Sequence, residues 1–150
     1  MRVGLFGGTF DPPHLGHLVT AVNVRHVLKL DLVILMVAND PWQKHGIREV
    51  ASASDRLAMV QAAIEGVDGL LAGDDEITRG GPSYTADTLA VLRERYRDAE
   101  IFTIVGDDAA ALRALRGGEA GVVRLAERQT MAVEVDRGEA RGIGGLGDGG

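Results

Sequence analysis

Two histidines, His14 and His17, lie three residues apart directly after a glycine-rich segment, and residues 7–17 read GGTFDPPHLGH. At positions i and i+3 of a helix, both imidazoles project from one face and can reach the same ligand. The first turn of a helix also presents unpaired N–H groups and the positive end of the helix dipole, which attract anions. This combination predicts a site that binds phosphate groups.

Glycines accompany the two histidines. Gly7 and Gly8 follow a short apolar run, and the lack of a Cβ lets a bulky ligand approach the backbone there. Gly16 lies between the histidines and leaves similar room for a ligand or a neighbouring strand. The sequence has neither a Gly-x-x-x-x-Gly-Lys-Ser/Thr loop nor a dinucleotide-binding glycine fingerprint. A His-x-x-His pair could hold a metal, but no third ligand is evident, so no protein metal site is predicted.

The apolar pattern around this segment predicts a strand, a helix and a second strand. Residues 3–6 and 32–38 are short apolar runs, typical of buried parallel strands. A helix is expected between them, from Leu15 to about Leu30. Its expected buried face has the spacing i, i+3, i+4 and i+7 and comprises Leu15, Leu18, Val19 and Val22.

The alternation of strands and helices continues along the chain. A second helix is expected to be capped by Ser54 or Asp55 and to turn three apolar side chains inward: Leu57, Val60 and Ile64. The further expected elements are a strand from residue 70 toward 77, a helix over 85–97, a strand over 101–105 and a helix through 115. This order predicts an α/β fold with a Rossmann-like, doubly wound parallel sheet.

The pattern weakens after Arg116. Residues 122–125 are expected to form a helical turn and residues 131–135 a last strand. Residues 142–150 contain six glycines and few apolar side chains, so a disordered tail is expected after a single domain over 1–141.

Composition narrows the classes of function. The 150 residues are 45% hydrophobic, which is enough to bury a core, and the net charge of −6 argues against a broad nucleic-acid surface. There is no cysteine, which excludes disulfides, thiolate metal sites and cysteine nucleophiles. No apolar run approaches the length of a membrane span, and no targeting segment is visible. A cytoplasmic protein without membrane or nucleic-acid partners is expected.

Residues 7–17 resemble the signature of the nucleotidylyltransferase superfamily, which shares a His-x-Gly-His type motif with class I aminoacyl-tRNA synthetases. Three further segments narrow the resemblance: residues 39–44 (NDPWQK), 79–89 (RGGPSYTADTL) and 106–108 (GDD). Together they are similar to the bacterial nicotinate-nucleotide adenylyltransferases of NAD biosynthesis. These enzymes join nicotinate mononucleotide to the AMP part of ATP and give deamido-NAD and pyrophosphate. The resemblance covers about residues 2–110.

The resemblance implies roles for particular residues. Direct action on the reacting phosphates is implied for His14, His17 and Lys44. Contacts with ATP are implied for Gly7, Gly8, Thr9, Phe10, Gly16, Gly106 and Asp108. Contacts with the nicotinate group are implied for Tyr84 and Thr85. Mg²⁺ is implied as well, held mainly by the ATP phosphates and water rather than by a carboxylate cage.

Each of these roles has a physical basis and a plainer alternative. Lys44 is a mobile point charge able to follow pyrophosphate, but a lysine on a loop is ordinarily only solvated. Tyr84 and Thr85 at a helix start can offer an aromatic surface and donors to a carboxylate, although Thr85 could simply cap that helix. Asp108 can accept from ribose hydroxyls at a strand's carboxyl end, or serve as an N-cap.

The sequence departs from the family in its last third. Full-length relatives carry a late Ser-Ser-Thr-x-x-Arg type motif that grips the ATP phosphates, and these 150 residues contain no serine after Ser83. Arg113, Arg116 or Arg124 could replace that motif in a minimal enzyme. Two alternatives therefore stand beside the adenylyltransferase hypothesis. One is a shortened, non-catalytic nucleotide-binding remnant, and the other is an enzyme with a different acceptor, such as nicotinamide mononucleotide or phosphopantetheine.

Overall fold

The computed structural model describes residues 1–40, 46, 49–106, 119–125 and 129–136; from Gly106 onward it describes the backbone only. The elements in chain order are β1 Arg2–Gly8, α1 Leu15–Val27, β2 Leu32–Val37, α2 Ala53–Ala63, β3 Leu70–Gly73, α3 Asp75–Arg79, α4 Thr85–Arg95, β4 Glu100–Gly106, β5 Glu119–Leu125 and β6 Gln129–Asp136. In the described part of the chain, no helix combines the length and the apolar character that a membrane crossing would need.

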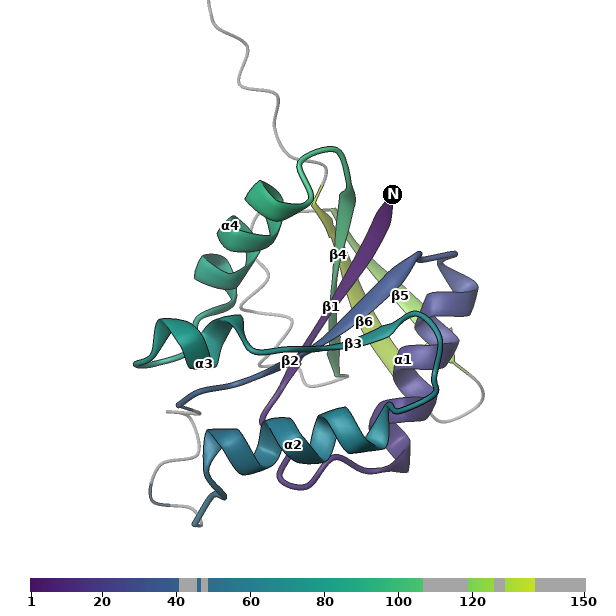
Figure 1. Ribbon diagram of the computed structural model, residues 1–150. Helices are drawn as coiled ribbons and strands as arrows, with labels where there is room; N and C mark the ends of the chain where they lie inside the picture. The colour runs from purple at the N-terminus through teal and green to yellow at the C-terminus, as the bar shows by residue number, and fades with distance from the viewer. Residues whose placement is uncertain (41–45, 47–48, 107–118, 126–128, 137–150) are drawn as a thin grey trace, which may run out of the picture.

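The six described strands form one sheet in the order β3-β2-β1-β4-β6-β5. The first four strands of that order are parallel, which confirms the predicted α/β class (Figure 1). β6 and β5 are antiparallel to their neighbours, so the sheet is mixed rather than wholly parallel. The helical turn predicted at residues 122–125 is wrong, because these residues belong to β5 and pair with β6.

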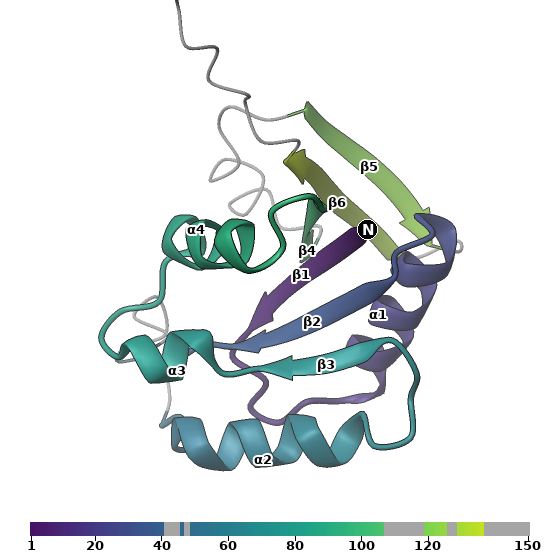
Figure 2. The ribbon, with the colours of Figure 1, turned by 45° about the horizontal axis from the view of Figure 1, so that its top comes forward.

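Helices cover both faces of the parallel strands (Figure 2). α1 and α2 contribute Ala21, Val24 and Val60 to the core on one face, and α4 contributes Leu92 to the core on the other. The central strand β2 alternates between the two cores, since Val33 and Leu35 face the first and Ile34 faces the second. A strand buried on both faces accounts for the continuous apolar run seen in the sequence.

The predicted buried face of α1 is wrong. Leu15 is 73% exposed, Val19 40% and Val22 44%, whereas Ala21 and Val24 are fully buried. A second stripe on the same helix has identical spacing and comprises His17, Thr20, Ala21, Val24 and Leu28. The stripe with small side chains faces the sheet, because Thr20, Ala21 and Val24 allow a close approach between helix and strands.

The start of α2 and the end of β3 differ from the predicted positions. α2 is capped by Ser52, whose hydroxyl accepts from the Asp55 N–H at 3.1 Å, rather than by Ser54 or Asp55. Val60 is buried, and Leu57 and Ile64 pack beside it as predicted. β3 ends at Gly73, and the chain turns directly into α3 instead of continuing as a strand toward Ile77.

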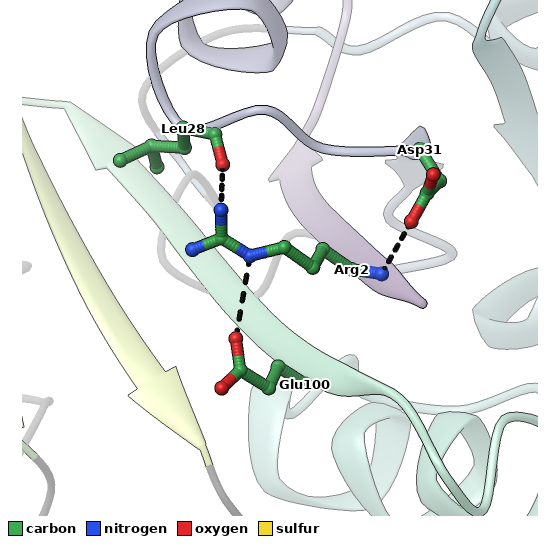
Figure 3. A network of polar contacts seen from close by, with 4 residues as sticks. All are labelled: Arg2, Leu28, Asp31 and Glu100. Carbon is green, nitrogen blue, oxygen red and sulfur yellow. Dashed lines mark hydrogen bonds and ion pairs between the residues drawn. The ribbon is translucent and has the colours of Figure 1, made fainter.

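Arg2 ties the amino ends of the strands together (Figure 3). Its backbone N–H donates to Asp31 Oδ2 at 2.7 Å, and its guanidinium donates to Glu100 Oε2 at 3.3 Å and to the Leu28 carbonyl. The guanidinium carbon also lies 4.7 Å from the ring centre of Phe102. These contacts join β1, β2, β4 and the end of α1 at the edge opposite the glycine-rich turn, so they are structural.

Candidate functional site

The candidate site lies at the carboxyl edge of the parallel strands. β1 pairs with β2 on one side and with β4 on the other, so the chain first builds outward to β3 and then returns past β1. In open α/β sheets, ligands bind at the carboxyl ends of the strands beside such a reversal. Gly7 and Gly8 close β1 and Gly106 closes β4, so three residues predicted to contact ATP lie on this edge.

His17 reaches this edge because of its place on α1. It is three residues before Thr20 and four before Ala21, and therefore extends the buried stripe of the helix beyond the end of β1. Its ring lies 4.9 Å from that of Phe10 and 6.1 Å from that of Phe6, at steep angles. These aromatic neighbours hold the imidazole in place on one side.

The two histidine rings stack, with 3.8 Å between their centroids and 24° between their planes. His14 is exposed, and its backbone N–H donates to Nδ1 of His17 at 3.1 Å. Since Nδ1 accepts this bond, the proton of a neutral His17 must sit on Nε2. The loop therefore fixes the tautomer that carries its proton on Nε2.

The ring of Phe10 packs against the ring of His17. Phe10 is 2% exposed, packs edge-on against Phe6 at 6.0 Å, and has a φ of 51°, in the left-handed region that non-glycine residues seldom adopt. Its side chain thus belongs to the core, and only its backbone is available to a phosphate. Backbone strain of this kind costs about 1–3 kcal/mol and concentrates at functional sites.

The three glycines of the segment serve different purposes. A Cβ on Gly8 would lie 2.9 Å from Cζ of Phe10, and one on Gly16 would lie 2.9 Å from Cε1 of His14. Those two glycines make room for the ring beside them. A Cβ on Gly7 would meet no atom of the described residues within 4 Å, so Gly7 alone of the three has open space beside it in that part of the chain.

Tyr84 and Thr85 begin α4. Tyr84 is the N-cap, is half exposed and makes no side-chain cap, and Thr85 is the first helical residue. Thr85 is therefore not the cap that the plainer interpretation assigned to it. Thr88 is fully buried, and its hydroxyl donates to Glu76 at 2.6 Å, which fastens α4 to α3.

Not every predicted feature can be placed. Two residues implied by the resemblance, Lys44 and Asp108, lie outside the described residues, as do Arg113, Arg116, the helix expected through residue 115 and the glycine-rich tail. The side chain of Arg124 is not described. Among the residues that are described, no three His, Cys, Asp or Glu side chains are grouped so as to hold a metal ion.

Residues 55–60 also resemble the second helix of the family, and from the sequence Arg56 is expected to be structural as often as functional. This side chain is 1% exposed, and it donates to four backbone carbonyls around the end of the sheet. Burial lowers the pKa of its guanidinium, and the nearby charge of Asp11 opposes that shift. The available signal was an arginine four residues before the inward-facing Val60, and therefore on the buried face of a helix.

A parallel sheet with flanking helices and a histidine pair at its first strand–helix junction has the architecture of a nucleotidylyltransferase-type Rossmann-like fold. A model of the cytidylyltransferase-like family matches residues 5–136, and the chain belongs to this family.

Curated relatives give a narrower comparison. The chain is 52% identical over 109 residues to a probable nicotinate-nucleotide adenylyltransferase of Desulfatibacillum aliphaticivorans, with 73% of this chain and 49% of that protein covered. Proteins of the same description from Corynebacterium kroppenstedtii and Gemmatimonas aurantiaca are 46% and 47% identical, with 73% and 72% of this chain and 52% and 50% of theirs covered. The chain spans about half the length of the curated relatives it matches.

Proposed function

We propose that the chain transfers the adenylyl group of ATP to nicotinate mononucleotide, giving deamido-NAD and pyrophosphate. The observation that carries this proposal is the oriented histidine pair beside an open Gly7 at the carboxyl end of β1. The names of the relatives supply the choice of acceptor.

The reaction needs no protein nucleophile. A phosphate oxygen of the mononucleotide forms a bond to the α-phosphorus of ATP, while the bond from that phosphorus to the bridging oxygen of pyrophosphate breaks. The protein has to align the two phosphates and stabilise the negative charge that moves onto the leaving group. His17 would donate through Nε2, His14 would lie beside it, and the backbone of residues 7–10 would line the triphosphate.

The remaining predicted residues would bind at either side of this centre. Lys44 would follow the departing pyrophosphate, and Gly16, Gly106 and Asp108 would contact ATP. Tyr84 and Thr85 would hold the nicotinate group at the uncapped start of α4, where backbone N–H groups can bind a carboxylate. Mg²⁺ would arrive with ATP, held by phosphate oxygens and water.

The direct test incubates the purified chain with ATP, Mg²⁺ and nicotinate mononucleotide and follows deamido-NAD by chromatography. Product formation is expected, at a higher rate than with nicotinamide mononucleotide. Calorimetric titration with ATP, run in parallel, identifies a protein that binds without turnover. If no product forms at enzyme concentrations approaching that of the substrate, the catalytic proposal is wrong and the binding remnant is the better description.

A further inference from the structure

Arg56 is a buried cation whose side-chain hydrogen bonds to the described residues all go to backbone carbonyls, with the charge of Asp11 nearby. Its Nε donates to the Ala51 carbonyl at 2.9 Å, and Nη1 donates to Thr9 at 2.9 Å and to Ala38 at 2.6 Å. Nη2 donates to the Asn39 carbonyl at 3.1 Å. One guanidinium from α2 thereby joins the loop after β1 to the loop after β2.

Asn39, whose carbonyl accepts from Arg56, makes a second set of hydrogen bonds with residues 81–83. The Asn39 N–H donates to Ser83 Oγ at 2.9 Å, and its Nδ2 donates to the Gly81 carbonyl at 2.9 Å. Ser83 N–H returns a bond to the Asp40 carbonyl at 3.4 Å, beside an isolated parallel bridge between Asp40 and Pro82. Residues 80–84, here called the acceptor loop, are thus fastened to the end of β2.

Burying a guanidinium whose hydrogen bonds go to neutral carbonyls is a costly way to gain stability alone, although the charge of Asp11 offsets part of the cost. Charged groups lose hydration energy when they are buried, and apolar replacements of similar volume often stabilise a protein. The rigid fork of a guanidinium does, however, fix several acceptors in one geometry. The carbonyls that Arg56 orients belong to two places. One is Thr9, in residues 7–10, which are proposed to line the triphosphate and are here called the phosphate-binding loop. The other is Ala38 and Asn39 after β2, where Asn39 in turn bonds the acceptor loop.

We propose that Arg56 is a positioning residue that sets the placement of the acceptor loop relative to the phosphate-binding loop, with Asn39 as the link between them. What each loop binds rests on the proposed function; the mechanical connection does not. Group transfer between two bound substrates is sensitive to misplacement on the scale of 1 Å, at a cost of about a hundredfold in rate. The buried fork of Arg56 fixes Thr9 relative to Asn39, and Asn39 bonds the acceptor loop, so together they control that distance.

Hydrogen exchange tests the connection without any substrate. In Arg56→Lys, the compact ammonium keeps the charge but cannot reach all four carbonyls. We expect the amides of Asn39, Ala51 and Ser83 to exchange about tenfold faster or more, because local opening becomes easier there. The strand amides of β1, β2 and β4 should keep their wild-type rates. Arg95→Lys, which alters the exposed ion pair with Asp75, is the matched control.

Two further variants locate the link. Ser83→Ala removes the acceptor of the Asn39 N–H and leaves every Arg56 contact in place, so only Asn39 and Ser83 should exchange faster while Ala51 is unchanged. Asn39→Ala removes the bond to Gly81 and should loosen the acceptor loop alone. If hydrogen exchange in Arg56→Lys becomes faster to the same extent at all strand amides, Arg56 contributes to stability and does not position the loops. If the Ser83 amide exchanges at its wild-type rate in this variant, the proposal is also wrong.

Kinetics then connects the loops to catalysis. Arg56→Lys should lower kcat and raise KM for both ATP and the mononucleotide, whereas Ser83→Ala should raise KM for the mononucleotide alone. Equal kinetics in wild type and Arg56→Lys, measured well below the melting temperature of both, would contradict a positioning role. A wild-type chain without transfer activity would instead refute the proposed function, and the exchange pattern would still decide on the connection.

Discussion

His17 combines a packing role with a chemical one. Its ring packs against Phe10 and Phe6, its Nδ1 accepts from the His14 N–H, and a neutral ring therefore carries its proton on Nε2. His14 lies against it at 3.8 Å, so any phosphate bound by one ring lies within reach of the other. Both functions follow from the position of His17 on the stripe of α1 that faces the sheet.

Replacing either histidine should remove transfer activity without unfolding the chain. His14→Ala and His17→Ala are expected to lower kcat by about a hundredfold to a thousandfold each, as the loss of a preorganised donor does elsewhere. Steady-state rates and thermal melts measure the two effects separately. His26→Ala, an exposed histidine in the last turn of the same helix, is the control and should leave the rate unchanged.

Alanine substitutions at the adjacent Gly7 and Gly8 should affect different properties, ATP affinity for the first and stability for the second. The Cβ of Gly7→Ala meets no atom of the described residues within 4 Å, so the free energy of unfolding should change by less than about 0.5 kcal/mol while ATP affinity falls. The Cβ of Gly8→Ala would collide with the buried ring of Phe10 and should destabilise the protein by roughly 1–3 kcal/mol. Denaturant melts and ATP titration of both variants decide this. Equal ATP affinity in Gly7→Ala and wild type would mean that the open space holds no ligand.

At the level of elements, the turn between α2 and β3 depends on contact with α1. Gly66 and Gly69 both have positive φ, 74° and 77°, but their surroundings differ. A Cβ on Gly69 would lie 2.0 Å from Nε of Arg25, whereas one on Gly66 would meet no atom of the described residues within 4 Å. Helix α1 is therefore held by this turn as well as by its apolar stripe.

Alanine substitutions should separate strain from steric conflict at this turn. Gly66→Ala is expected to cost about 1 kcal/mol, from the unfavourable backbone conformation alone. Gly69→Ala adds a collision with a side chain whose Nε is buried without a partner among the described residues, and should cost more than about 2 kcal/mol. Chemical denaturation of the two variants provides the comparison, and equal losses would contradict the packing of Arg25 over this turn.

The Arg2 contacts at the opposite edge should affect stability and not function. Arg2→Ala removes a part-buried guanidinium that bonds Glu100 and the Leu28 carbonyl, and a loss of about 1–2 kcal/mol is expected. The ion pair itself contributes little because both partners are substantially exposed. Melting temperature should fall while kcat and KM at low temperature stay at wild-type values. A changed KM for ATP would show that the two edges of the sheet are coupled.

At the scale of the molecule, the sequence predicted the parallel part of the fold well. Apolar runs such as 32–38 are buried on both faces, and that environment leaves a plain signal. The strand at residues 119–125 was missed because its pairing with β6 depends on contacts beyond the local pattern. Helix α1 has two stripes of side chains with the same spacing, so the sequence pattern alone could not show which stripe is buried. The stripe with small residues is buried because it allows the helix to lie close to the sheet.

The candidate site was predicted from side chains, and what was missed lies in the backbone. The position of the histidine pair followed from its motif, but the stacked rings and the tautomer of His17 depend on a bond from the His14 N–H. The role of Arg56 could not be read from its residue type, because its four acceptors are carbonyls of distant segments.

A crystal structure of the chain with a non-hydrolysable ATP analogue and Mg²⁺ measures the central feature directly. The triphosphate is expected at the carboxyl end of β1, beside Gly7, with Nε2 of His17 and the His14 ring within hydrogen-bonding distance of phosphate oxygens. A triphosphate bound elsewhere, or a His17 ring turned so that Nε2 points into the Phe6–Phe10 core, would contradict this assignment of the site.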